Sequence, residues 1–148
     1  MPPMDPRTRF YYQGRGPQYW ELYMVLNNRK TWYEARKHCQ HNELDLVFMN
    51  TIGMAGILTV FRTLTKKQDL PQNEVLWHGL PQGWNSPKGA RCPVMAMRYD
   101  LNLFFDRKCN QTTGKDEYGN ILVGYFCGRE ISEGEYFYGL RHDRDWDY

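Results

Sequence analysis

The sequence lacks the motifs by which several functional classes are recognised. It contains no Walker-type phosphate loop, no Gly-x-Ser-x-Gly nucleophile motif and no Gly-x-Gly-x-x-Gly stretch. No two cysteines have the Cys-x-x-Cys spacing of a zinc ribbon or a redox motif. We therefore do not expect an enzyme, and disulfides explain the four cysteines better than a metal site does.

Long apolar runs and a surplus of one charge are also missing. No run of 18 apolar residues exists, so we expect no transmembrane helix. The stretch from Met1 to Pro6 has no apolar core of the kind found in a signal peptide. With 19 basic and 17 acidic side chains, the net charge is +2. That balance gives no case for a nucleic-acid partner or an anionic membrane.

Aromatic residues and cysteines are what the sequence does contain. Aromatics make up 16% of its 148 residues, which suits a compact fold, a recognition surface or both. This length is enough for one domain that buries roughly two-thirds of its unfolded surface. Four cysteines allow three disulfide pairings. The sequon Asn110-Gln111-Thr112 predicts a glycan at Asn110 and agrees with an extracellular or secreted protein.

The chain begins with a Pro- and Gly-rich extension, residues 1–18, whose composition cannot bury much on its own. Residues 19–26 then alternate as a strand does. Thr31 and Glu34 form a Thr-x-x-Glu capping box that starts a helix. The side chains expected on its buried face are Trp32, Ala35 and Cys39.

Further elements follow from periodicity and turn residues. In order, we expect a short strand at 44–48, a helix at 54–64, a strand at 75–77, a loop at 81–91, strands at 94–99 and 101–105, a polar loop at 110–120, a strand at 121–127 and a tail at 131–148. Two helices followed by several short strands indicate an α+β fold.

These motifs, taken together, resemble the C-type-lectin-like domain across residues 19–130. The family has a first strand, two helices, a Trp-Ile-Gly-Leu strand, a long loop and a sheet closed by the last cysteine. Here Trp77-His78-Gly79-Leu80 stands at the third of these, with one change. The resemblance implies a small twisted antiparallel sheet, a long loop region and two disulfides, Cys39–Cys127 and Cys92–Cys109.

The family's calcium motifs are mostly absent. Sugar-binding members carry Glu-Pro-Asn or Gln-Pro-Asp in the long loop and Trp-Asn-Asp before the third cysteine. This chain has Ser86-Pro87-Lys88 and Phe104-Phe105-Asp106 instead. Calcium needs six to eight oxygen ligands, so one carboxylate and a lysine do not make its site. We expect no calcium and no other cofactor. Lys88 either pairs with Asp106 in its place, or both are ordinary solvated charges.

The resemblance places a ligand-binding surface on the long loop and the strands beside it. Trp84 is either a core plug under this loop or an exposed platform for a sugar ring or a partner side chain. We expect calcium-independent recognition of a protein ligand or partner subunit. Alternatives are a carbohydrate-binding lectin, or a structural subunit of an extracellular assembly that forms oligomers through its terminal extensions. The candidate ligand-binding residues are Trp84, Asn85, Lys88, Arg98, Phe105 and Asp106.

Two smaller hypotheses concern the first helix and the tail. His38 and His41, with Glu34, have the spacing for a metal site, but we expect ordinary surface histidines and no metal. Tyr136 to Tyr138 suggest a strand added to the domain's own edge or inserted into another chain. The acidic end, residues 143–148, is either a linear motif or a disordered terminus.

Overall fold

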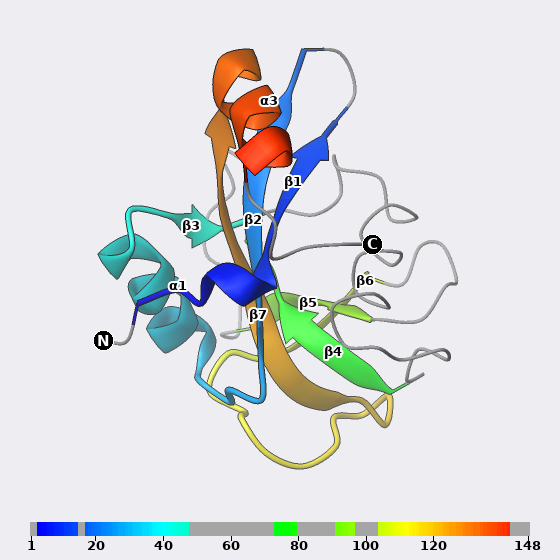
Figure 1. Ribbon diagram of the computed structural model, residues 1–148. Helices are drawn as coiled ribbons and strands as arrows, with labels where there is room; N and C mark the ends of the chain where they lie inside the picture. The colour runs from blue at the N-terminus through cyan, green and yellow to red at the C-terminus, as the bar shows by residue number, and fades with distance from the viewer. Residues whose placement is uncertain (1–2, 15–16, 48–72, 80–90, 97–103, 143–148) are drawn as a thin grey trace.

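The computed structural model describes residues 3–14, 17–47, 73–79, 91–96 and 104–142 (Figure 1). The helix predicted at 54–64 lies outside these residues. The elements are η1 (Pro6–Thr8), β1 (Arg9–Gln13), β2 (Tyr19–Leu26), α1 (Trp32–His41), β3 (Asp45–Leu46), β4 (Glu74–Trp77), β5 (Arg91–Ala96), β6 (Phe104–Lys108), β7 (Ile121–Ile131) and α3 (Glu133–His142).

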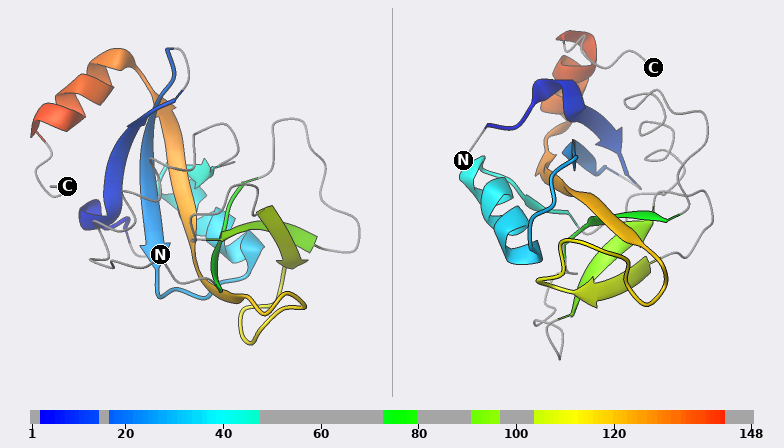
Figure 2. Two further views of the ribbon diagram at one scale, coloured as in Figure 1. Left: turned by 90° about the vertical axis from the view of Figure 1, so that its right-hand side faces the viewer. Right: turned by 90° about the horizontal axis from the view of Figure 1, so that it is seen from below.

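One sheet organises the molecule. Its strand order is β1-β2-β7-β4-β5-β6, and β3 pairs with β7 beside this path. The long strand β7 curves through the centre of the sheet, with α1 on one side and α3 at its end (Figures 1 and 2). The predicted α+β fold is confirmed. The sheet is mixed, however, because β4 runs parallel to β7 while the other pairs are antiparallel.

Strand β2 is buried on both faces and contributes side chains to two apolar clusters. Leu22 and Met24 pack into one apolar cluster with residues of β1 and β7. Tyr23, which points to the opposite face, belongs to a second cluster beneath α1. The strand predicted at 19–26 is confirmed with the same bounds.

Part of the predicted N-terminal extension is a strand of this sheet. Strand β1 pairs with β2 in antiparallel register, with Phe10 opposite Leu22, and Phe10 is fully buried. The expectation that residues 1–18 bury little is therefore wrong for this segment. Composition averaged over the segment hid its aromatic run, Phe10 to Tyr12, which suits a half-buried strand.

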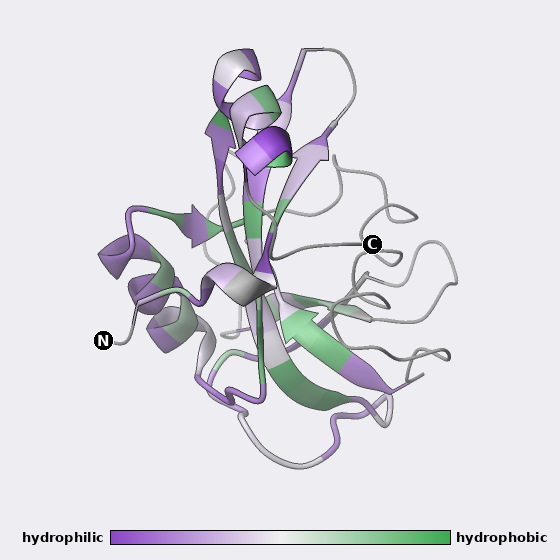
Figure 3. Ribbon diagram, in the orientation of Figure 1, coloured by the Kyte–Doolittle hydropathy of each residue, from purple (hydrophilic) through white to green (hydrophobic). Residues whose placement is uncertain are grey.

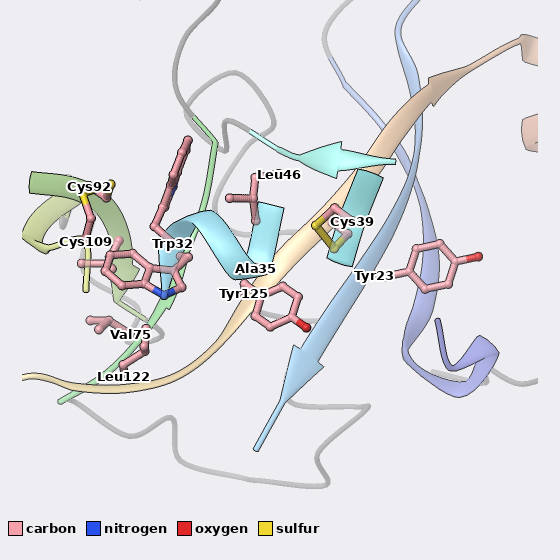
Figure 4. Packing of buried hydrophobic residues seen from close by; sticks show 13 residues of the cluster. Tyr23, Trp32, Ala35, Cys39, Leu46, Val75, Cys92, Cys109, Leu122 and Tyr125 are labelled. Atoms are coloured by element: carbon pink, nitrogen blue, oxygen red, sulfur yellow. A yellow bond between two sulfur atoms is a disulfide. The ribbon is translucent and has the colours of Figure 1, made fainter. Parts of the chain in front are cut away.

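The first helix, α1, begins where the capping box predicted. The Thr31 side chain accepts a hydrogen bond from the Glu34 amide, and the Glu34 carboxylate accepts one from the Thr31 amide, each at 3.1 Å. The backbone-bonded Glu34 carboxylate consequently has a lowered pKa. The predicted face, Trp32, Ala35 and Cys39, is buried. It packs on β4 and β7, which are among the most hydrophobic parts of the sheet (Figures 3 and 4).

Both disulfides implied by the resemblance are present. Cys39–Cys127 joins α1 to the middle of β7, and Cys92–Cys109 joins β5 to the residue that follows β6 (Figure 4). No described cysteine is free. The first bond ties together segments 88 residues apart in the sequence, and the second closes a much shorter stretch of 17.

Several strands have bounds that differ from the prediction. Strand β3 covers only Asp45–Leu46 of the expected 44–48, and β5 begins at Arg91, inside the predicted loop 81–91, rather than at 94. Strand β6 covers Phe104–Lys108 rather than 101–105, and residues 101–103 lie outside the described residues. Strand β7 continues to Ile131 instead of ending at Cys127, because β2 offers partners as far as Tyr19, opposite Ile131. The polar residues between Cys127 and Ile131 broke the apolar run on which the prediction relied.

The C-terminal tail forms the helix α3, so the predicted edge strand is wrong. Ser132 caps this helix: its hydroxyl accepts a hydrogen bond from the Glu135 amide at 3.1 Å, and the Glu135 carboxylate accepts one from the Ser132 amide at 3.4 Å. This Ser-x-x-Glu signal was in the sequence. The aromatic residues beside it favour a strand by composition, although here they lie on a helix.

Candidate functional site

An ion-pair cluster lies on the sheet edge next to the long-loop region. The Arg91 guanidinium, on β5, donates to the Asp106 carboxylate on β6 at 2.7 Å and to the Asp106 carbonyl at 3.1 Å. It also donates to the Glu117 carboxylate from the loop that precedes β7. The Asp106 carboxylate, supported by Glu117, raises the pKa of Arg91. One cation thus holds two carboxylates, one from β6 and one from the loop before β7.

Most of the predicted ligand-binding residues lie outside the described residues, so their placement is not tested. This is so for Trp84, Asn85, Lys88 and Arg98, and for the side chain of Phe105, whose backbone belongs to β6. Asp106 is described, and its carboxylate accepts its hydrogen bond from Arg91. The pairing predicted between Asp106 and Lys88 stays a prediction.

Arg91 and Glu117 are the residues of this cluster that the sequence analysis missed. A signal for Arg91 was available, because it precedes Cys92 and Asp106 lies three residues before Cys109. A disulfide between those cysteines brings the two strands together, with Pro93 opposite Asp106 and Arg91 close by. Glu117 has no such signal, since it comes from a loop.

The family's calcium chemistry does not fit these residues. Calcium requires several oxygen ligands that are free to turn toward the ion. Asp106, the carboxylate that resembles the last residue of the family's Trp-Asn-Asp motif, already faces the Arg91 guanidinium. A cation within hydrogen-bonding distance of a ligand carboxylate repels a divalent ion and competes for the oxygen. No group of three His, Cys, Asp or Glu side chains in the described ranges has metal-binding geometry.

The polar loop between Cys109 and β7 is organised around a buried arginine. The Arg107 side chain is fully buried, and its guanidinium donates to the carbonyls of Asn120 and Gly114 at 3.3 and 3.4 Å. The Asp116 carboxylate lies 4.0 Å away and accepts hydrogen bonds from the Tyr118 and Asn120 amides. Burial lowers the pKa of Arg107. The loop is therefore internally bonded rather than free to follow a ligand.

The histidines of α1 do not share one face. His38 is buried and bonds the Tyr125 hydroxyl, whereas His41 is exposed, and Glu34 is engaged in the helix cap. His38 is therefore a core residue and His41 a surface residue, so their spacing does not bring them together as metal ligands. A third histidine, His78, is also buried, and desolvation lowers its pKa to about 3. Its carbonyl accepts a hydrogen bond from the Trp32 indole at 3.0 Å.

A groove of about 360 Å³ lies between α3 and the sheet. Glu21 is nearly buried there and accepts hydrogen bonds from the Tyr23 hydroxyl at 2.7 Å and from Arg129 at 3.0 Å. Arg129 also reaches Glu135 of α3 at 3.1 Å. Burial and the Glu21 carboxylate together raise the pKa of Tyr23 to about 12. The charges in this groove bind one another and fix α3 to the sheet.

The predicted glycan site is accessible. Asn110 is exposed at the start of the loop that leads from the second disulfide to β7, and its modification stays a prediction. A separate finding concerns membranes: within the described part of the chain, no helix is both long and apolar enough to span one.

Comparison with known proteins gives a structural match only. No protein-family model and no curated protein matches the sequence. Among solved structures, the C-type-lectin-like domain of mouse CD72a superposes on this chain with a TM-score of 0.52. The alignment covers 86% of this chain and 94% of that domain, at 13% sequence identity. At such a low identity the match shows the fold and does not identify a ligand.

Proposed function

Since this chain has the C-type-lectin-like fold, we propose that it is a non-catalytic recognition module that binds a protein ligand without calcium. The long loop and the β5–β6 edge form the ligand-binding surface. Two disulfides and an exposed sequon at Asn110 favour an extracellular or secreted setting.

The observation that carries this proposal is the contact between Arg91 and Asp106. In the sugar-binding pattern of the family, a carboxylate in this position holds calcium, and calcium in turn holds the sugar hydroxyls. Here the Arg91 guanidinium donates a hydrogen bond to the Asp106 carboxylate at 2.7 Å and a second one to the carbonyl of the same residue. Strands β5 and β6 are thereby joined by an ion pair that needs no metal. A surface built in this way recognises shape and side chains, as protein interfaces do.

The proposal separates a protein-binding module from a lectin in a glycan-array experiment. The chain, labelled and presented as a tetramer on streptavidin, is applied to the array in millimolar calcium and again in chelator. We expect chelator to abolish the binding of no glycan on the array, because under this proposal no calcium ion bridges the protein and a sugar. Asp106→Asn is the matched variant, since it would remove the carboxylate with little change in shape.

Two outcomes of this experiment would contradict the proposal. Glycan binding that disappears in chelator and in Asp106→Asn would restore the calcium mechanism. Glycan binding that survives chelator and is lost in Trp84→Ala would support the alternative of a calcium-independent lectin. If neither kind of glycan binding is observed, recognition of a protein ligand remains the proposed function of this surface.

A further inference from the structure

The helix α3 has one face on the sheet and one in solvent. Gly139 lies against the Tyr11 ring, and the Tyr136 ring lies 4.7 Å from that of Tyr19. Large apolar side chains of α3 remain partly accessible: 48% of Phe137, 67% of Tyr138 and 40% of Leu140. The Phe137 ring lies at the border of the sheet contact, 6.2 Å from that of Tyr19, and Tyr138 lines the groove between α3 and the sheet. Exposed apolar residues gathered on ten residues of helix mark an interaction surface.

The residues of this exposed face are spaced symmetrically about Phe137. Glu133 precedes Phe137 by four residues and Arg141 follows it by four, so all three lie on one side of the helix. Gly134 and Leu140 are likewise three residues before and after it. Both Glu133 and Arg141 are exposed, and neither forms an ion pair with another described residue.

Such spacing makes the face complementary to itself. When two copies of α3 pack antiparallel about a two-fold axis at Phe137, Glu133 of each copy lies opposite Arg141 of the other. Leu140 then meets the small Gly134, and the two Phe137 rings meet at the axis. The arrangement forms the same contacts twice, as an isologous interface requires.

We propose that a second copy of this chain docks on the exposed face of α3, forming a symmetric homodimer. The face lies on the end of β7 that carries α3, away from the β5–β6 edge, so the dimer leaves the proposed ligand-binding surface open (Figures 1 and 2). Ten residues of helix span only about 15 Å. An interface of that size is small, so the dimer forms and dissociates with concentration.

Charge reversal tests the proposal on the full chain by sedimentation velocity over a concentration series. We expect Glu133→Arg or Arg141→Glu alone to weaken dimerisation about tenfold, because each change places like charges opposite each other twice. Both changes together restore the pairs with exchanged partners and recover most of the affinity. Lys37→Glu, an exposed charge on α1, is the matched control and leaves the dimer unchanged. Raising the salt concentration weakens the native dimer.

Cross-linking at the axis gives a second readout that does not depend on affinity. A short bis-maleimide joins two copies of Phe137→Cys and not two copies of Lys37→Cys, because only position 137 lies beside its own counterpart. A chain that stays monomeric throughout the concentration series overturns the proposal, and so does a double reversal as weak as either single one. Either result would assign the face to residues 143–148 of the same chain or to a different protein. The glycan-array result is independent of all these outcomes.

Discussion

Replacing Cys39 and Cys127 together by alanine should lower the free energy of unfolding by about 4–5 kcal/mol. The bond joins residues 88 apart, so its loss frees most of the unfolded chain from a constraint. Both sulfur atoms also sit in fully buried positions between α1 and β7. Because small domains are stable by only about 5–15 kcal/mol, this change should remove between about a third and nearly all of the stability. Urea denaturation followed by tryptophan fluorescence measures the change.

The second disulfide provides the control for this experiment. Cys92 and Cys109 are only 17 residues apart, so their joint replacement by alanine should cost less, about 3 kcal/mol. It should also leave the α1–β7 contact intact. A larger loss from the second pair than from the first would contradict the view that the bond between α1 and β7 is the main covalent support of the fold.

Replacing Gly124 by alanine should destabilise the protein by about 3 kcal/mol or more. A Cβ atom at this position would lie 1.8 Å from the Val25 carbonyl oxygen and 2.9 Å from its carbon. Those are backbone atoms of the paired strand β2, which cannot rotate away as a side chain can. Strands β2 and β7 would have to separate, and β7 is the strand on which β4 also shifts its register. Thermal unfolding gives the measurement.

Gly134→Ala is the matched control, because the same added methyl meets only open space. Its nearest heavy atom would be the Ser132 hydroxyl oxygen at 4.0 Å, and alanine favours a helix over glycine. We expect this variant to be neutral or slightly more stable when compared at a low protein concentration. A tolerated Gly124→Ala would show that β2 and β7 approach less closely than described.

The parts of the fold that the sequence predicts are those fixed by local rules or by the cysteines. Thr31 and Glu34 specify the start of α1 through contacts three residues apart, and the structure confirms them. The order of the cysteines among aromatic motifs implied both disulfide pairings through the family resemblance. Alternation located β2, since every second residue from Trp20 to Leu26 is apolar.

Other parts depend on neighbours that are distant in sequence. Strand β1 is stable only because β2 covers Phe10, which the composition of the N-terminal segment cannot reveal. Strand β7 extends past Cys127 for the same reason, through its pairing with β2. The helix α3 is a different case, because its cap at Ser132 was visible and the adjacent aromatics outweighed it.

The candidate site divides in the same way. Asp106 was identified from the resemblance to a family motif, and its part in ligand binding stays a prediction. Its partner Arg91 depends on the register of the β5–β6 pair, and Glu117 on the path of a loop held by the buried Arg107. The β5–β6 register is indicated in the sequence only through the implied Cys92–Cys109 disulfide, and no local pattern predicts the loop path that brings in Glu117.

The most direct test of the central claim is a calcium titration of the full chain, monitored by thermal unfolding in calcium and in chelator. If Arg91 occupies the Asp106 carboxylate in place of a metal, the melting temperature should be the same in both. A melting temperature that rises with calcium would contradict the account, because an ion that binds the folded state stabilises it. Loss of that rise in Asp106→Asn would place the ion on this carboxylate.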